Sequence, residues 1–543
     1  MKIGIDLDNT IIDYENIFIK TAKVNKFIFQ NSKILNKKDL KKTILRKRSI
    51  ETWQLLQGIV YGKKIKNAQI MSNFISFIKT AEIFDCEIFI VSHKTKYGHY
   101  LNKKINLQTE AYKWIKFNLI ENNKLKIIKK KNIYFCESLR EKVNQINKLD
   151  LDIFIDDLPK VVNHTNLSKK ILKILLNKDI DAKNIEVINF KNWLSIKNFL
   201  FNNFTTKNIK NLLIKSNFKK NLNFKNIKKI SHSINSKTYL LHQNNGKKFI
   251  MKIYLNQLND FRNRIKQEIN AYNLLNKNNI HQIPKIIYSS ESYNFIILEY
   301  INGSNFTKIA DLDLIDLLDF LKQLKKITSR NYNIYPFDAS EATFNFKDLS
   351  KNLNNRIKNL LTISKNYKIL DKFLKFELIP KWKKINKNLI INHDNKISVL
   401  NLNKKNRILS PSDFGFQNMI KYNGKIFFMD FEYFGMDDPV KLVSDFILHP
   451  KNNLTKKQIK IWIDENSKMF IDDKYFNLRL KLYLPIFCIK WSIILLNVFL
   501  QNYNNRNQLF KTKIYSSDIL RKKIYESRKY CLMSDNITNI LIK

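Results

Sequence analysis

The first part of the chain alternates short apolar segments with amphipathic ones. Residues 2–5, 87–91 and 151–155 are predicted strands, and each is followed directly by polar side chains. Residues 110–119 and 139–149 place apolar side chains at helical spacing. Strands that alternate with helices predict an α/β domain built on a parallel sheet. Because the carboxyl ends of parallel strands meet at one edge, we expect the polar residues there to form one site.

The later part of the chain predicts a mixed α+β domain. Residues 239–242 and 248–254 form two apolar segments around Asn245-Gly246, which is a strong signal for a two-residue hairpin turn. Residues 264–275 have helical spacing, and 295–301 form a further apolar strand. This order of two strands, a helix and another strand differs from the regular alternation of the first part, so we expect a separate domain.

Composition limits the choice of function. A chain of 543 residues is too long for one ordinary core, so we expect two or three domains. Its 44% hydrophobic content suits globular cores and argues against general disorder. The net charge of +50 raises nucleic acid as an alternative partner. The positive charge is mostly lysine spread along the chain, without a nucleic-acid-binding motif, so we interpret it as solvated surface and expect no nucleic-acid partner.

Cysteine usage and apolar segments bear on the compartment. The four cysteines are scattered without CxxC spacing, which favours free thiols in a reducing compartment over a zinc site or disulfides. Residues 1–6 run directly into a strand, so we expect no signal peptide. Residues 482–500 are apolar enough for a membrane span, but Lys490 and Asn497 would be costly in lipid and favour a buried helix. We therefore expect a cytoplasmic protein without a membrane partner.

The polar residues of the first domain form a set of four short motifs. These are Asp6-x-Asp8-x-Thr10, Ser92, Lys142 near the head of a helix, and Asp156-Asp157. Together they resemble the haloacid dehalogenase-like (HAD) superfamily over about residues 1–200. The resemblance implies a Rossmann-like parallel sheet with a helical cap inserted at about 14–80. Cap residues Trp53, Tyr61, Lys63 and Lys64 would contact a substrate or, equally well, form ordinary cap core and surface.

The same resemblance implies Mg²⁺-dependent phosphoryl transfer. Asp6 would attack phosphorus to form an aspartyl-phosphate, and Asp8 would protonate the leaving oxygen and then activate water. Ser92 and Lys142 would hold the phosphoryl group. The implied metal ligands are Asp6, Asp8 through its carbonyl, Asp156 and Asp157. The presence of Asp8 implies a phosphatase or phosphotransferase; the alternative is that these carboxylates only cap strand ends.

A second catalytic set lies within residues 409–432. Asp413 is followed by Asn418, and Asp430 ends an apolar strand. Phosphoryl transfer from ATP needs a carboxylate that orients the attacking hydroxyl, and an amide and a carboxylate that hold Mg²⁺. The run resembles the aminoglycoside phosphotransferase/choline kinase family, which has a two-lobed protein kinase-like fold. In this resemblance Asp413 is the catalytic residue and Asn418 and Asp430 bind the metal.

The kinase resemblance covers roughly residues 205–543. It implies an N-lobe over 205–300 and a C-lobe over 301–543, with residues 201–229 as linker and domain start. Lys252 would contact the α/β-phosphates of ATP and pair with Glu268. The other implied nucleotide contacts are Glu299 and Ile301 at the hinge, and Asn235, Ser236 and Lys237 in the loop over the phosphates.

Two positions depart from the family pattern. The phosphate-covering loop, residues 231–237, contains no glycine, although backbone must approach the phosphates closely there. Pro411 stands two residues before Asp413, where the family commonly has histidine. These departures put the geometry of the loops in question more than the chemistry.

Both motif sets together predict a bifunctional enzyme: a HAD-type phosphatase joined to an ATP-dependent small-molecule kinase. The expected cofactors are Mg²⁺ and ATP, and the expected partners are small molecules, namely a hydroxyl acceptor such as a sugar, an amino alcohol or an aminoglycoside-like compound, and a phosphomonoester. One alternative is that only one domain is active and the other binds or regulates. A basic nucleic-acid-binding protein is the less favoured alternative, because its charge would have to concentrate in a groove with interleaved aromatics.

Overall fold

The computed structural model divides the chain near residue 222 into two compact units, unit 1 before that point and unit 2 after it. Both units mix helices and strands, as the sequence predicts. The structure describes residues 1–98, 105–177, 187–218, 224–232, 235–255, 262–306, 308–331, 333–393, 400–501 and 515–538.

Unit 1 is built on a six-stranded sheet in which every described pairing is parallel. The strand order is β5-β4-β1-β6-β7-β8. The strands are β1 (Lys2–Ile5), β4 (Glu87–His93), β5 (Ile133–Cys136), β6 (Ile153–Asp156), β7 (Leu172–Leu176) and β8 (Val187–Phe190). The predicted parallel sheet is therefore confirmed. The chain leaves β1 for β4 on one side and later crosses to β6 on the other, so β1 marks a topological switch point, where open α/β sheets bind ligands.

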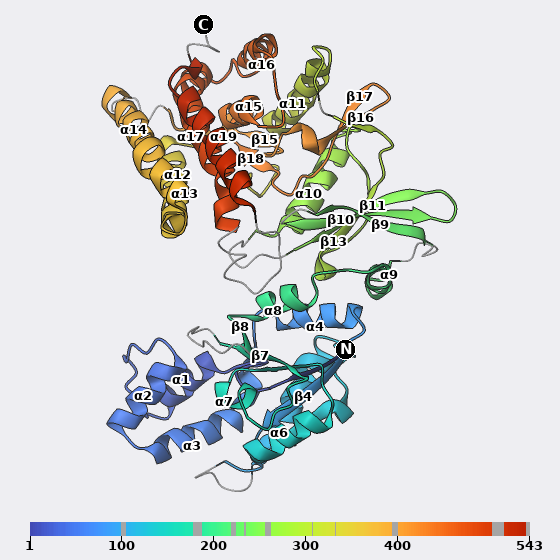
Figure 1. The fold of residues 1–543 in the computed structure, drawn as a ribbon, viewed down its shortest axis with the longest axis vertical. Coiled ribbons are helices and arrows are strands. Elements are labelled where there is room, and N and C mark those ends of the chain that lie inside the picture. The colour runs from blue at the N-terminus through green and yellow to red at the C-terminus, as the bar shows by residue number, and fades with distance from the viewer. Residues whose placement is uncertain are drawn as a thin grey trace. The chain divides into compact units, whose positions relative to one another are not determined.

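Four α-helices lie between β1 and β4, the next strand of the main sheet, and the first three form an inserted segment: α1 (Glu15–Val24), α2 (Lys37–Lys47) and α3 (Ile50–Tyr61). These three helices lie together in Figure 1. The two ends of the inserted segment meet in a short antiparallel pair of strands, β2 (Ile12–Asp13) and β3 (Gln69–Ile70). The chain returns to the sheet where Met71 N–H donates to Ile11 O over 2.8 Å. The inserted segment thus ends near residue 70, earlier than the boundary of about 80 expected from the sequence, because α4 (Phe74–Ile83) packs with α8 (Trp193–Leu200) instead.

The stretch from 201 to 215 belongs to unit 1, although the sequence suggested a linker and the start of the second domain there. Helix α9 (Thr206–Lys215) packs on α4. Asn208 and Asn211 donate to Ile83 O over 3.4 and 3.0 Å, and Lys215 pairs with Glu82 at 2.8 Å. These polar contacts hold α9 to the sheet domain. The remaining helices of unit 1 are α5 (Leu107–Ile115), α6 (Leu139–Lys148) and α7 (Pro159–Val162).

Unit 2 begins with a five-stranded antiparallel sheet in the order β12-β13-β11-β10-β9. The strands are β9 (Phe224–His232), β10 (Ser236–Gln243), β11 (Lys248–Tyr254), β12 (Ile286–Ser290) and β13 (Phe295–Glu299), and helix α10 (Arg264–Lys277) follows β11. The predicted hairpin around Asn245-Gly246 is confirmed by the β10–β11 pairing. Gly246 has φ +83°, a left-handed conformation that glycine adopts without steric cost.

Short strands and long helices complete unit 2. The strands are β14 (Ser304–Asn305), β15 (Ile408–Ser410), β16 (Met419–Tyr422), β17 (Lys425–Phe428) and β18 (Gly435–Asp437). The helices are α11 (Asp313–Arg330), α12 (Phe346–Ser364), α13 (Lys368–Phe373), α14 (Ile379–His393), α15 (Pro439–Leu448), α16 (Lys456–Met469), α17 (Phe476–Leu495) and α19 (Ser517–Met533). Figure 1 shows α12, α14, α17 and α19 gathered in one part of the unit.

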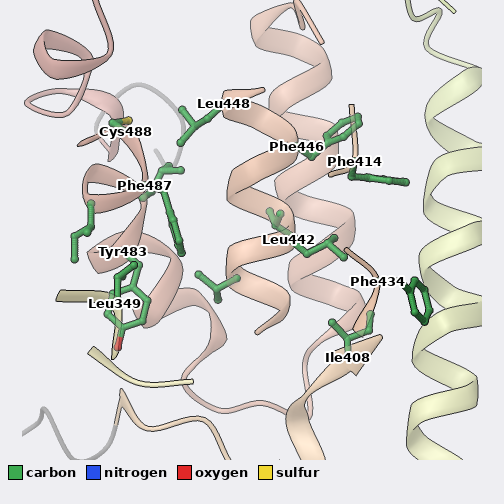
Figure 2. Close-up of a cluster of buried hydrophobic side chains, with 14 of the residues drawn as sticks. Leu349, Ile408, Phe414, Phe434, Leu442, Phe446, Leu448, Tyr483, Phe487 and Cys488 are labelled. Carbon is green, nitrogen blue, oxygen red and sulfur yellow. The ribbon is translucent and has the colours of Figure 1, made fainter. Parts of the chain in front are cut away.

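The core of unit 2 supports the predicted catalytic loop. Phe414 is 4% exposed and stacks on Phe428 with ring centroids 5.7 Å apart. Figure 2 shows Phe414 near Phe446 of α15, with Phe487 of α17 on the other side of that helix. Because Phe414 is anchored in this apolar layer, its neighbour Asp413 is held at the edge of the core.

One helix of unit 2 is long and apolar enough to cross a membrane by length and composition. Among the described residues this is the helix Phe476–Gln501. In its most apolar window, 61% is buried inside the structure. Lys490 within it is 2% exposed and pairs with Glu341. A buried core helix passes the same test, and the polar contact of Lys490 fits that interpretation.

Candidate active sites

In unit 1, carboxylates from two neighbouring strands meet at the carboxyl edge of the sheet. Asp6 follows β1 and Asp156 ends β6, and both are nearly or fully buried. With Asp157 they place one oxygen each within 4.8 Å of one another. Burial raises the pKa of Asp6 well above its usual value, and it raises that of Asp157 to about 7. A compact all-carboxylate group of this kind fits the oxygen ligands that Mg²⁺ prefers.

Lys142 joins two of these carboxylates. Its ammonium lies 2.5 Å from Asp6 Oδ1 and 2.6 Å from Asp156 Oδ2, and the side chain is 1% exposed. Helix α6 positions it, and Ser138 caps that helix by accepting from Glu141 N–H. Burial alone would lower the pKa of Lys142, but Asp6 and Asp156 raise it above its ordinary value. The structure therefore brings Asp6, Asp156 and Lys142 together, as the motif spacing required.

Ser92 and Asp8 complete the expected set. Ser92 is the penultimate residue of β4, which pairs with β1, and its hydroxyl oxygen is buried without a hydrogen-bond partner in the described structure. Such a group is costly to leave unpaired, so it is available to a ligand. Asp8 accepts from Tyr14 Oη over 2.8 Å and pairs with Lys94 at 2.7 Å. Sequence reasoning missed Tyr14 and Lys94; the only signal was their proximity to motif residues in the sequence.

The inserted helices contribute two side chains near these motifs. Lys37 of α2 donates to Asn9 Oδ1 over 3.0 Å and to Tyr61 Oη over 3.2 Å. Burial lowers the pKa of Lys37 to about 8. Tyr61, one of the expected cap residues, therefore does reach this region. Trp53 instead stacks on Phe18 within the helical cluster at 5.4 Å, and Lys63 is exposed.

In unit 2, Lys252 gathers the acidic side chains of the expected nucleotide site. Its ammonium lies 2.8 Å from Glu268 Oε2 on α10 and also binds Asp430. Burial raises the pKa of Glu268 to about 7. Burial alone would lower the pKa of Lys252, but the carboxylates of Asp430 and Glu268 raise that pKa well above its ordinary value. Tyr254 donates to Glu268 over 2.5 Å and supports the pair. The structure thus pairs a strand lysine with a helix glutamate, as expected from the sequence.

Glu432 is an acidic member of this site whose role the sequence did not indicate. It lies 3.3 Å from Lys252 and 3.0 Å from Arg264, and accepts from Asn235 Nδ2 over 2.8 Å. Glu268, Asp430 and Glu432 each place an oxygen within 4.8 Å of the others, so they too fit a divalent cation. Asn235 thereby ties the loop before β10 to the loop after β17.

Asp413, Asn418 and Asp430 converge through a small hairpin. Asn418 Nδ2 donates to Asp413 O over 3.0 Å, and Met429 N–H donates to Asn418 O over 2.9 Å, which sets Asn418 beside Asp430. Ser412 and Asp430 have left-handed backbones, with φ of 64° and 66°. Such conformations cost about 1 kcal/mol or more for non-glycine residues and cluster at functional sites.

Asp413 has two side-chain partners that sequence reasoning missed. His449 Nε2 lies 3.3 Å from Asp413 Oδ1, and Gln417 Nε2 donates to the same oxygen over 3.1 Å. His449 follows α15, far along the chain, so no local motif could reveal it. Pro411 stands where the family commonly has histidine. His449, from another part of the chain, instead places an imidazole at Asp413.

The remaining expected nucleotide contacts fall in different places. Ser236 pairs with Tyr254 in the sheet and shares the face of Lys252, whereas Lys237 pairs with Ile253 and points to the opposite face. Lys237 is therefore not brought to the Lys252 site, because strand alternation reverses its direction. Glu299 accepts from Lys285 N–H over 3.3 Å, and Ile301 is 8% exposed just after β13. Residues 233 and 234 of the expected phosphate loop lie outside the described residues.

Comparison with known proteins finds a family model that matches part of the second unit. Residues 226–370 match the family model described as "Phosphotransferase enzyme family", so the chain contains a kinase-type phosphotransferase domain. The matched stretch includes Lys252 and Glu268, while Asp413, Asn418 and Asp430 lie beyond it. No curated protein matches the sequence.

Solved structures give weaker similarities. Choline kinase from Cryptosporidium parvum is 12% identical, with 62% of this chain and 98% of that chain covered and a TM-score of 0.41. Choline kinase LicA from Streptococcus pneumoniae is 14% identical over 59% and 98%, with a TM-score of 0.38. Ethanolamine kinase from Plasmodium vivax is 15% identical over 61% and 93%, with a TM-score of 0.38. At these scores we base no conclusion on the structural likeness.

Proposed function

We propose that unit 2 transfers the γ-phosphoryl group of ATP to a hydroxyl of a small molecule. The observation that carries this proposal is the contact of Lys252 with both Glu268 and Asp430. Lys252 and Glu268 lie within the stretch that matches a phosphotransferase family. Kinase-like sites need this lysine to hold phosphates and this aspartate to hold Mg²⁺. The geometry of Asp413 and Asn418 around the same hairpin supports the remaining roles.

The reaction assigns one task to each residue of unit 2. Asp413 orients the acceptor hydroxyl and takes its proton as the hydroxyl oxygen forms a bond to the γ-phosphorus. The bond from that phosphorus to the bridging oxygen breaks, and ADP leaves. Asp430 and Asn418 are the residues that would hold Mg²⁺, which supplies positive charge against the phosphate oxygens. Lys252 binds the α/β-phosphates, and Glu268 holds Lys252 in position.

The test is acceptor-dependent transfer of label from [γ-³²P]ATP. Purified full-length protein, Mg²⁺ and labelled ATP are incubated with choline, ethanolamine, kanamycin and a set of sugars and sugar acids. The proposal requires a labelled phosphoester with at least one hydroxylated acceptor. Lys252→Met should abolish it, whereas exposed Lys481→Gln should not. Label that appears only as inorganic phosphate with every acceptor would count against a kinase.

We propose as a second function that unit 1 is a HAD-type phosphatase. The observation that favours it is the buried group of Asp6, Asp156 and Lys142 beside the unpartnered hydroxyl of Ser92. Asp6 would attack the phosphorus of a phosphomonoester, and the alcohol would leave with a proton from Asp8. Water, deprotonated by Asp8, would then cleave the aspartyl-phosphate and release inorganic phosphate. Asp6, Asp156 and Asp157 would hold Mg²⁺, which offsets the negative charge of the phosphoryl group.

Release of inorganic phosphate from a panel of phosphomonoesters without ATP tests the second function. Asp6→Asn should abolish release, and Asp413→Asn should leave it unchanged, because the two residues belong to different units. Release that persists in Asp6→Asn but is lost in Asp413→Asn would show that the activity does not reside in unit 1.

A further inference from the structure

Positive charge is concentrated in the inserted segment of unit 1. From residue 16 to residue 50 the chain has eleven lysines and arginines and a single acid, Asp39. This stretch therefore carries +10 of the net charge of +50 within 35 of the 543 residues. That is about three times the share that an even spread of the charge would give. The inserted segment is thus a local basic region.

Helix α2 separates its apolar side chains from its basic ones. Leu40 and Ile44 are fully buried on the side that packs on α1 and α3. The other side of the helix carries exposed residues at spacings of three and four, namely Lys38, Lys41, Lys42 and Leu45. Because the inner side holds α2 in unit 1, the outer side is available to a partner.

The loop between α1 and α2 lies beside the end of α2. Arg48, just after the helix, donates to Lys26 O over 3.3 Å. The ammonium of Lys47 lies 6.0 Å from the centroid of the Phe29 ring. The loop and α2 therefore form one surface, residues 25–48, which we call the basic surface.

Large apolar side chains protrude from the basic surface. Leu35 is 85% exposed and Phe29 is 78% exposed, the highest values among the large apolar side chains that the structure describes. Leu45, on the outer side of α2, is 41% exposed. A single exposed apolar residue is normal, but three on one strongly basic surface indicate a site of interaction.

A partner of the basic surface must match both its charge and its apolar side chains. An anionic lipid surface matches both, because lysine and arginine bind lipid phosphates while Phe and Leu enter the boundary between headgroups and acyl chains. A nucleic acid would match the charge, but only Phe29 could stack on a base, and Leu35 and Leu45 would stay uncovered. A second copy of the chain would bring the same positive charge and be repelled.

We propose that the basic surface docks unit 1 on an anionic phospholipid bilayer. The side chains of Phe29, Leu35 and Leu45 enter the interface, and the lysines of α2 lie against the lipid phosphates. Such peripheral binding needs neither a spanning helix nor a signal peptide, the two features from which a membrane partner was judged in the sequence. Docking does not depend on either proposed catalytic function.

Co-sedimentation with lipid vesicles tests this docking. Full-length protein is mixed with vesicles of phosphatidylcholine alone, or of equal parts phosphatidylcholine and phosphatidylglycerol, at low and at high salt. We expect binding to the mixed vesicles only. Salt should weaken that binding without abolishing it, because salt screens the charges and leaves the apolar contacts.

A charge-matched pair of variants separates the basic surface from the charge of the whole chain. Each variant replaces three exposed lysines with Gln, at positions Lys41, Lys42 and Lys47 of α2 or, as the control, at Lys383, Lys384 and Lys387 of α14. The α2 variant should bind the mixed vesicles about tenfold more weakly or worse, and the α14 variant should bind nearly as wild type. Equal weakening in both variants would show diffuse attraction by the net charge and would contradict a dedicated surface.

A second pair of variants tests insertion of the apolar side chains. Phe29 and Leu35 are both replaced with Ser, and the control replaces the equally protruding Leu312 and Ile471 of unit 2. Only the first variant should lose the binding that persists at high salt. In a further protein, Phe29→Trp, the added fluorescence should be quenched by vesicles whose acyl chains carry bromine.

The same proteins are also titrated with a random oligonucleotide. Tighter binding of the oligonucleotide than of the anionic vesicles, lost in the α2 variant, would assign the basic surface to nucleic acid and overturn the membrane assignment. Absence of binding to the mixed vesicles would overturn it as well. So would unchanged high-salt binding in the folded Phe29→Ser, Leu35→Ser protein.

Discussion

His449 Nε2 lies 3.3 Å from Asp413 Oδ1, at the residue expected to orient the acceptor hydroxyl. Lys451 N–H donates to His449 Nδ1 over 3.1 Å, so the ring carries its proton on Nε2 and directs it toward Asp413. Gln417 donates to the same carboxylate oxygen. One oxygen of Asp413 is therefore held by two donors, which leaves the other for the acceptor hydroxyl.

Replacement of His449 should slow phosphoryl transfer without weakening ATP binding. His449→Ala removes one of the two groups that fix Asp413, and a misplacement of about 1 Å can cost roughly 10–100-fold in rate. His449→Gln should recover much of the rate, because its amide can also donate to Asp413. The measurement is kcat and the KM for ATP in both variants. A purely structural role would be indicated by equal loss in both variants together with a lower melting temperature.

Gly415 offers an independent way to move the same groups. A Cβ there would lie 2.5 Å from His449 Cε1 and 2.4 Å from Gln417 Oε1, so both side chains would have to shift. Gly415→Ala should therefore reduce kcat to a similar extent as His449→Ala, with a small effect on stability because the crowded atoms belong to side chains. Combining Gly415→Ala with His449→Ala should add little, since both act on one contact. Fully additive losses in the double variant would argue against this shared cause.

The sequence predicted which residues meet at each candidate site better than it predicted their supporting contacts. Asp6, Lys142 and Asp156 stand at predictable ends of strands and helices, so strand alternation alone brought them to one edge. Lys252 and Glu268 follow in the same way from a strand and the next helix. The predicted contact of Lys237 with the nucleotide was wrong because side chains alternate between the two faces of a strand. The face on which Lys237 lies depends on its pairing with Ile253 of β11, which the sequence does not show.

Long-range partners could not be predicted from the sequence. His449 and Lys490 reach their partners only through the packing of α15 and α17, and neither lies in a motif. Helix α9 has a polar face that looked like linker, and its contacts with α4 and Ile83 O show that it belongs to unit 1. In each case a contact between distant elements decided the role, and a local pattern carries no information about such contacts.

Glu341 should make the stability of unit 2 depend on pH in acid. Burial would raise its pKa, but Lys490 and Arg356 lower it in the folded state to about 2, below the ordinary 4.5. Its stabilising contribution is therefore complete above about pH 4.5 and is lost as the pH falls toward 2. The contribution is on the order of 2–3 kcal/mol. Glu341→Gln should be less stable than wild type at pH 6, with the difference shrinking by pH 3. Calorimetry measures this difference in stability, with the unfolding transition of unit 2 identified as the one that the ATP analogue shifts. A stability difference between Glu341→Gln and wild type that stays constant with pH would contradict the assignment.

In unit 1, Asp6 and Asp8 should give distinguishable defects. Asp6→Asn should abolish phosphate release and the acid-stable, base-labile phosphoenzyme expected of an acyl phosphate, because the nucleophile is gone. Asp8→Asn keeps the nucleophile but loses the group that activates water, so a slowly formed phosphoenzyme should accumulate. BeF₃⁻ should bind wild type in a Mg²⁺-dependent manner and fail to bind Asp6→Asn. A covalent label on any residue other than Asp6 would overturn this mechanism.

Transfer from [γ-³²P]ATP by the Asp413→Asn variant tests the central claim most directly. The substitution keeps the shape of the side chain but removes the carboxylate that takes the hydroxyl proton, and such losses cost about 10²–10⁴-fold. Wild type and Asp6→Asn, as matched control, are compared with Asp413→Asn at saturating ATP and acceptor. We predict labelled phosphoester from the first two proteins, a loss of that size in Asp413→Asn, and nucleotide affinity unchanged in all three. Transfer by Asp413→Asn at a rate near that of wild type would contradict the assignment of unit 2 as a kinase that works through Asp413.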